Sequence, residues 1–140
     1  MTPTEQDIEF FKEAKRIQEE WEPKIGDWFL YVDEEPKIVD EELFVIMRGF
    51  GYTDEHIWLP YLDQLIEMLE ERGWAWRVAY YYGSEWDNRE YEATLAKCDA
   101  IHSNAKGTDD RDFVENVRGP TPSIALGRAL IEALKEEWGG

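Results

Sequence analysis

Cysteine, histidine and long apolar runs are all scarce in this chain of 140 residues. The single cysteine, Cys98, allows neither an internal disulfide nor a cysteine-rich zinc site. The two histidines, His56 and His102, lie in no metal-binding or nucleophile motif. We therefore expect no catalytic residue, no metal ion and no cofactor, and a protein that is not an enzyme. No apolar run approaches the roughly 18 residues of a membrane-spanning helix, and residues 1–7 carry no signal-peptide pattern, so we expect a cytoplasmic protein without a membrane partner.

Basic residues are also few. Fifteen Lys and Arg stand against 32 Asp and Glu, which gives a formal net charge of −17. This charge argues against direct binding to nucleic-acid backbones, which requires clustered basic side chains. The excess lies in the first hundred residues, because 101–140 hold 7 acidic and 5 basic residues. A small anionic ligand would therefore meet least repulsion in the last third, and a basic protein partner would be attracted to the rest.

Hydrophobic periodicity and capping residues predict the helices and strands in the first half of the chain. We expect a surface helix over 4–21, capped by Thr4, and then short antiparallel strands at 28–32 and 37–39. A further apolar run follows at 43–47. A second helix is predicted over 59–72, with Pro60 in its first turn and Gly73 after its end. The acidic clusters at 33–35 and 40–42 lack the spacing of a calcium loop, so we expect a solvated rim there.

Period-two alternation over 74–82, followed by a return strand over 90–98, predicts a long hairpin. We expect a mobile loop over 99–120 and a final helix over 122–137, capped by Thr121 with Pro122 at its first position. The order of elements predicts an α+β class, with an antiparallel β-sheet flanked by helices in a sandwich-like single domain, 1–140. Within it, 1–57 would form a helix with short strands, and 58–138 an α-β-β-α core.

The segment before the last helix is the strongest candidate for ligand binding. A helix N-terminus offers free backbone N–H groups and the positive end of the dipole. Thr121 and Ser123 add hydroxyl groups, Arg118 adds a guanidinium, and Gly119 would let a ligand approach the backbone. These four residues could hold a nucleotide-like anion. The alternative is a well-capped helix after a tight turn, with Arg118 in solvent.

The aromatic hairpin is the second candidate. We expect the even-numbered face of 74–82 to be core. Arg77, Tyr81 and Trp86 are then candidates for a ligand wall or for a contact in a homo-oligomer. Ordinary core and rim packing is the alternative for these aromatic residues.

The stretch from Trp58-Leu59-Pro60 through the hairpin to the run Gly119–Leu130 resembles small phage and prophage accessory proteins of the phage ABA-sandwich type. The resemblance covers 58–138; residues 1–57 and 99–117 depart from it. That group includes nucleotide-sequestering proteins that act against the Thoeris defence system and bind cyclic ADP-ribose-type signals without cleaving them. The resemblance implies a sheet between helices and an anion held by Arg118, Gly119, Thr121 and Ser123.

Three functions follow as hypotheses. The first is a non-enzymatic phage or prophage accessory protein that binds a nucleotide-like anion at the N-terminus of the last helix. The second is an acidic protein-interaction module, either a DNA mimic or an inhibitor of a basic host protein. The third is a hydrolase that uses His56 or His102.

Overall fold

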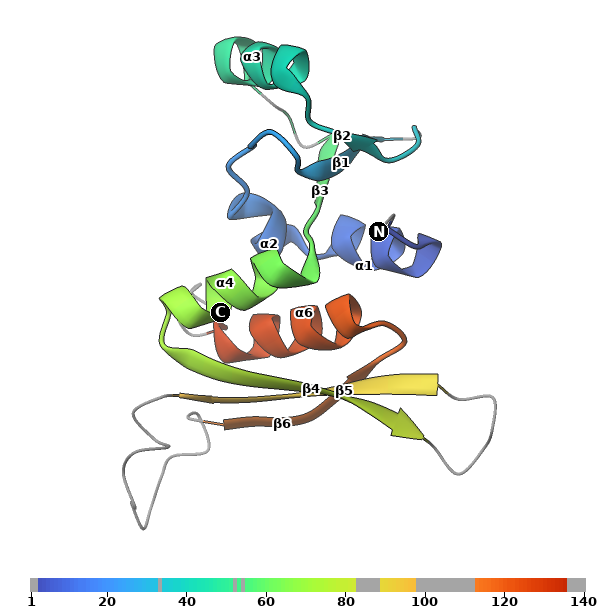
Figure 1. Ribbon diagram of the computed structural model, residues 1–140, viewed down its shortest axis with the longest axis vertical. Helices are drawn as coiled ribbons and strands as arrows, with labels where there is room; N and C mark the ends of the chain where they lie inside the picture. Colours follow the sequence, from blue (N-terminus) through green and yellow to red (C-terminus); the bar gives the residue numbers. More distant parts are fainter. Residues whose placement is uncertain are drawn as a thin grey trace. The chain divides into compact units, whose positions relative to one another are not determined.

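The computed structural model describes residues 3–32, 34–51, 53, 55–82, 89–97 and 113–135. The chain forms two compact units, Met1–Tyr61 (unit 1) and Leu62–Gly140 (unit 2). Within the described ranges lie five helices and two three-stranded antiparallel sheets, so the predicted α+β class is confirmed (Figure 1). None of the described helices combines the length and the apolar character needed to cross a membrane.

Unit 1 begins with two short helices, α1 (Glu5–Glu13) and α2 (Lys15–Glu19), in place of the predicted single helix over 4–21. Thr4 caps α1 as expected, in a reciprocal capping box with Asp7. The helix is interrupted at Ala14, whose ψ of 65° is not helical. The prediction of a surface helix was wrong, because Phe11 and Ile17 are fully buried in the unit.

The strands of unit 1 are β1 (Trp28–Tyr31), β2 (Lys37–Ile38) and β3 (His56–Leu59), in the order β2-β1-β3. The predicted antiparallel pair 28–32 and 37–39 is confirmed by the partners Trp28 and Ile38. The third strand was not predicted, because its last residues were assigned to the start of the helix over 59–72. The aromatic and β-branched residues of 56–59 pair instead along the whole of β1.

The side chain of Gln18 completes the outer edge of β3. Its Oε1 accepts a hydrogen bond from the backbone N–H of Trp58 at 2.6 Å, and its Nε2 donates to the carbonyl of Trp58 at 2.8 Å. Nε2 also donates to the carbonyl of Phe11 at 3.0 Å. One side-chain amide thus pairs with both backbone groups of an edge residue, as a neighbouring strand would, and it ties α1 and α2 to the sheet.

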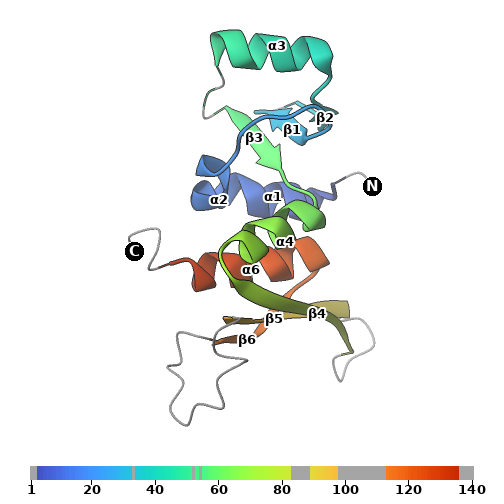
Figure 2. The same cartoon turned by 60° about the vertical axis from the view of Figure 1, so that its left-hand side comes forward.

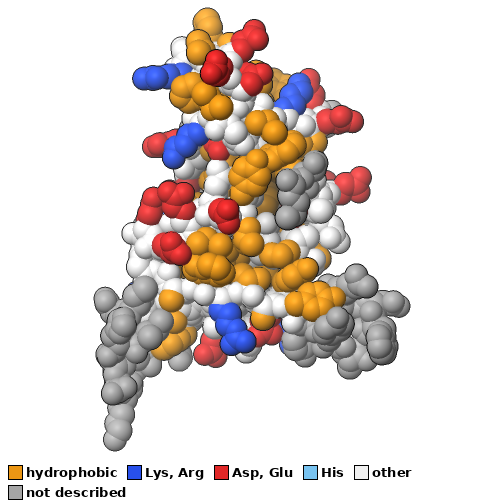
Figure 3. Space-filling model, viewed as in Figure 1, with side chains coloured by type: hydrophobic (Ala, Val, Ile, Leu, Met, Phe, Trp, Pro, Cys, Tyr) orange, Lys and Arg blue, Asp and Glu red, His pale blue; other side chains and the backbone are white. Residues whose placement is uncertain are grey.

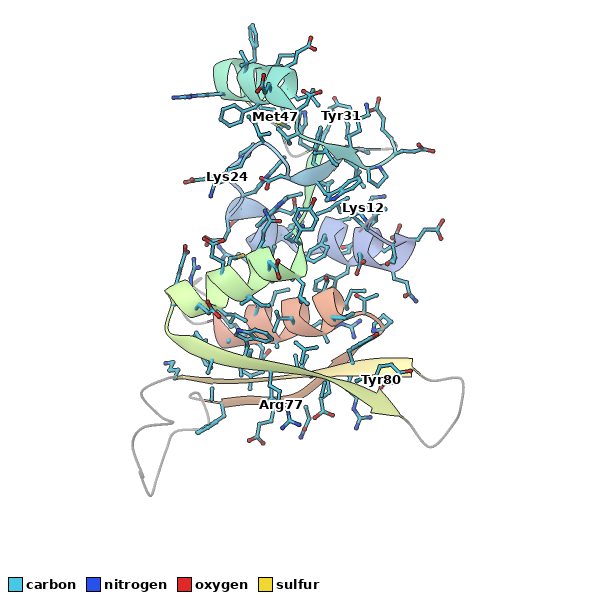
Figure 4. All side chains as sticks on the ribbon, viewed as in Figure 1. Lys12, Lys24, Tyr31, Met47, Arg77 and Tyr80 are labelled. Carbon is cyan, nitrogen blue, oxygen red and sulfur yellow. The ribbon has the colours of Figure 1, made fainter. Side chains whose placement is uncertain are left out.

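The apolar run 43–47 lies in a helix, α3 (Glu41–Phe50), and not in a strand. Asp40 caps it by accepting from the backbone N–H of Leu43 at 2.8 Å, so part of the acidic cluster at 40–42 starts a helix. Figure 2 shows α3 beyond the strands of unit 1, on the side opposite α1 and α2. Met47 is the buried residue of α3, and it projects toward the strands (Figure 4).

Unit 2 consists of the sheet β4-β5-β6 and two helices that cover one of its faces (Figure 1). Its elements are α4 (Leu62–Glu71), β4 (Trp74–Tyr82), β5 (Arg89–Lys97), β6 (Phe113–Gly119) and α6 (Pro122–Ala133). The predicted hairpin is confirmed, and its register places Val78 opposite Ala93. The helix predicted over 59–72 begins later, at Leu62, and Gly73 follows it with a φ of +78°.

Strand β6 corrects the predicted loop over 99–120. Phe113, Val114 and Val117 are its apolar residues, and the strand pairs antiparallel with β5. Asn116 adopts a φ of 58° where the register shifts between Ala93 and Leu95. This bulge breaks the period-two pattern, which hides the strand from sequence analysis. Residues 99–112 lie outside the described residues.

Replacing Gln18 tests its role at the edge of β3. We expect Gln18→Ala to lower the free energy of unfolding by about 2–4 kcal/mol, because three backbone groups in a half-buried position lose their partner. Urea unfolding followed by circular dichroism measures the change. Gln6→Ala, at an exposed position of α1, is the matched control and should change stability by less than about 0.5 kcal/mol. Equal effects of the two substitutions would contradict this role.

Candidate functional site

The N-terminus of α6 has the geometry predicted for a capped helix. The Oγ1 atom of Thr121 accepts from the backbone N–H of Ile124 at 3.1 Å, and Pro122 occupies the first helical position. The hydroxyl of Thr121 therefore serves its own helix. Ser123 is half-buried in the first turn.

Arg118 lies in β6, opposite Glu92 on the neighbouring strand. Its Nε is 3.6 Å from a carboxylate oxygen of Glu92, and its Nη1 is 3.9 Å from Glu90. Its carbonyl accepts from Nη1 of Arg128 at 2.8 Å. The guanidinium that was expected to face an anion thus lies next to two carboxylates of its own sheet. Their negative charge repels an anionic ligand.

Gly119 is buried where β6 passes α6. A Cβ added there would lie 2.6 Å from the backbone nitrogen of Ala125 and 3.0 Å from the Cγ2 of Ile124. The absence of a side chain therefore permits close packing of the strand on the helix. Anion binding by Arg118, Gly119, Thr121 and Ser123 stays a prediction, although each contact described for Arg118, Gly119 and Thr121 is made within unit 2.

The prediction that the even-numbered face of 74–82 is core is confirmed for Trp74 and is wrong for Trp76 and Tyr80. Trp74 is buried on the face covered by α6, whereas Trp76 and Tyr80 on the same face remain 39% exposed, because β4 is an edge strand. Arg77 lies on the opposite face and points away from α6 (Figure 4). The side chain of Tyr81 and all of Trp86 lie outside the described residues, so the predicted ligand wall stays a prediction.

The most unusual surface of the described chain lies on α3, where three large apolar side chains are exposed. Phe50 is 91% exposed, Val45 67% and Ile46 45%. Figure 3 shows hydrophobic side chains next to acidic ones in this part of the protein. We call Val45, Ile46 and Phe50 the α3 surface.

Acidic side chains adjoin the α3 surface. Residues four apart lie above one another on a helix, so Glu42 precedes Ile46 along one line and Glu41 precedes Val45 along the next. Both carboxylates are exposed, as is Arg48 in the last turn. Unit 1 as a whole carries 16 acidic and 6 basic residues. The α3 surface is therefore preceded by two carboxylates in the first turn of its helix, within a strongly negative unit.

The negative charge of unit 1 also alters one tyrosine. The hydroxyl of Tyr31 donates a hydrogen bond to the carboxylate of Glu55. This bond, together with the charge of Glu55, raises the pKa of Tyr31 above its ordinary value of 10.0. Tyr31 thus stays a neutral donor through the physiological range.

Sequence analysis did not identify the α3 surface. The signal was available: an apolar run directly after an acidic cluster, with more apolar residues than one helix face can bury. Assigning Leu43–Met47 to a region of short strands hid that excess.

Comparisons of the chain with protein-family models, with curated proteins and with solved structures find no match. Any functional proposal for the chain therefore depends on its own sequence and geometry.

A substitution at Gly119 tests whether this glycine is required for packing of β6 on α6, and not only for the approach of a ligand. We expect Gly119→Ala to lower the free energy of unfolding by about 2–3 kcal/mol without any ligand, since the new methyl group meets the backbone of α6. Gly49→Ala is the control: open space surrounds this helical position, and the substitution should raise stability by about 0.5–1 kcal/mol. Chemical denaturation measures both. Unchanged stability of Gly119→Ala would contradict the packing role.

Proposed function

We propose that this chain is a non-enzymatic protein-interaction module that binds a partner with a basic surface through the α3 surface. The observation that carries the proposal is the exposure of Phe50, at 91%, beside Val45 and Ile46 on the same helix. Large apolar side chains gathered at one place on a surface are typical of protein contact sites. An accessory role in phage biology, as the resemblance implies, is part of the same proposal, because it too requires binding without catalysis.

Charge determines the kind of partner. A second copy of this chain would bring together two units that each carry 16 acidic and 6 basic residues, and their like net charges oppose such a contact. A partner with Lys or Arg around an apolar depression would instead meet complementary charge on the 16 acidic residues of unit 1. The acidic residues would accelerate the encounter, and the apolar side chains would hold the complex.

A DNA mimic is one form of this function. If the basic surface of the partner normally binds duplex DNA, the carboxylates of unit 1 would occupy the positions of phosphates. The apolar side chains of α3 would then add contacts that DNA lacks. Competition by duplex DNA distinguishes a DNA-binding partner from another basic protein.

The test begins with photo-crosslinking in extracts of the cells that produce the chain. A photoreactive residue at Val45 should capture one protein that the same residue at Glu13, exposed on α1, does not capture. We expect the purified partner to bind Phe50→Ser at least about tenfold more weakly than the parent chain, as at central apolar contacts in other interfaces. Ile25→Ser, which alters an exposed apolar residue of unit 1 outside α3, should bind within about twofold of the parent.

Titration at two salt concentrations completes the experiment. Because exposed charges are screened by salt, affinity should fall between 50 and 300 mM salt. Equal affinities of Phe50→Ser and Ile25→Ser, or an affinity that salt does not change, would contradict the proposal. A dimer of the chain that Phe50→Ser abolishes would overturn it in favour of self-association.

A further inference from the structure

Unit 1 contains a hollow of about 500 Å³ whose wall is rich in hydrogen-bond donors. Lys12 comes from α1, Lys15 from α2, Thr53 from the segment before β3 and His56 from β3. This volume is in the range of pockets that take small organic ligands. We propose that the hollow binds a small organic anion, with a phosphate or carboxylate at the lysines.

The lining of the hollow carries two lysines and one glutamate. The side chain of Lys15 makes no ion pair or hydrogen bond with any described residue, whereas the Nζ of Lys12 forms a long ion pair with Glu9 at 3.9 Å. Glu19 is the acidic residue of the wall, and its carboxylate lies 3.3 Å from the guanidinium of Arg16. Two lysines thus flank one hollow in a unit that is otherwise strongly acidic, which is an arrangement suited to an oxyanion.

His56 lines the hollow and has one ring nitrogen left as a donor. The backbone N–H of Thr53 donates to its Nδ1 at 3.0 Å. Since a backbone N–H can only donate, Nδ1 is unprotonated in the neutral ring and Nε2 carries the proton. The ring is also held by edge-on contact with Tyr31, with ring centres 5.0 Å apart. A fixed N–H donor therefore accompanies the two mobile ammonium groups.

Trp21 is a buried, rigid residue at the edge of the hollow. Its Nε1 donates to the buried carboxylate of Asp27 at 2.9 Å, and its ring lies nearly parallel to that of Trp58, at 5° and 6.3 Å between centres. The indole is thus fixed on two sides before any ligand arrives. Only 2% of its surface is exposed, so it forms a fixed boundary of the hollow and offers no ring face for stacking. Ile57 also lines the hollow.

Four benzene derivatives test the proposal with the full chain. Phenyl phosphate and benzoate carry the two kinds of oxyanion, phenol is neutral at pH 7, and benzylamine is cationic. We expect the two anions to shift the amide resonances of Lys15, Thr53, His56 and Ile57 in ¹H–¹⁵N spectra, and phenol and benzylamine to leave them in place. The tighter of the two anions identifies phosphate or carboxylate as the preferred group.

Charge reversal locates the site. Lys15→Glu should weaken binding of the tighter anion at least about tenfold, and Lys15→Gln by a smaller factor, since only the first adds repulsion. Lys24→Glu makes the same charge change at an exposed lysine of unit 1 outside the hollow (labelled in Figure 4) and should weaken binding less than about twofold. Circular dichroism confirms that each variant is folded.

Three results would overturn the proposal. They are the absence of shifts with either anion up to 10 mM, equal binding of phenol and the anions, and equal losses in Lys15→Glu and Lys24→Glu. Failure of the partner-binding experiment on α3 would leave this proposal standing, because the two surfaces share no residue.

Discussion

The arrangement of unit 1 depends on one side-chain amide bonded to the edge of a sheet. Gln18 pairs with the backbone of Trp58 through both its donor and its acceptor, and so holds α2 against β3. Three residues further along the chain, Trp21 stacks on Trp58; three residues before, Lys15 lines the hollow beside His56. The same pairing covers an edge strand whose free N–H and C=O groups would otherwise invite association with other chains.

Folding of unit 1 leaves apolar side chains unburied, and this constrains what the unit can do. Burial of Met47 attaches α3, while Val45, Ile46 and Phe50 remain in solvent. The chain as a whole has a net charge of −17. This combination favours a binding surface whose apolar side chains contact the partner and whose charge selects it. Unit 2 is different: its sheet, α4 and α6 bury their apolar faces against one another, and its predicted ligand residues Arg118 and Thr121 already serve neighbouring groups.

Capping residues and hydrophobic alternation predicted the elements that depend on residues close in sequence. Thr121, Pro122 and Gly73 marked helix ends correctly, and alternation over 74–82 predicted the hairpin. Strands β3 and β6 were missed because distant partners and a bulge define them. The hollow was beyond sequence analysis, since Lys12 and Lys15 meet Thr53 and His56 only in the folded unit. The α3 surface could have been predicted from the sequence by comparing the apolar run at 43–47 with a helical period.

In the proposed function, the exposed apolar side chains of α3 serve binding and not folding. The most direct test of this role is the free energy of unfolding of a Val45→Ser/Phe50→Ser double variant, with Met47→Ser for comparison. Serine has nearly the same helix propensity as valine and phenylalanine, so the account predicts a change within about 0.5 kcal/mol for the double variant and a loss of at least about 2 kcal/mol for the buried methionine. A comparable loss in the double variant would place Val45 and Phe50 in the core and contradict the account.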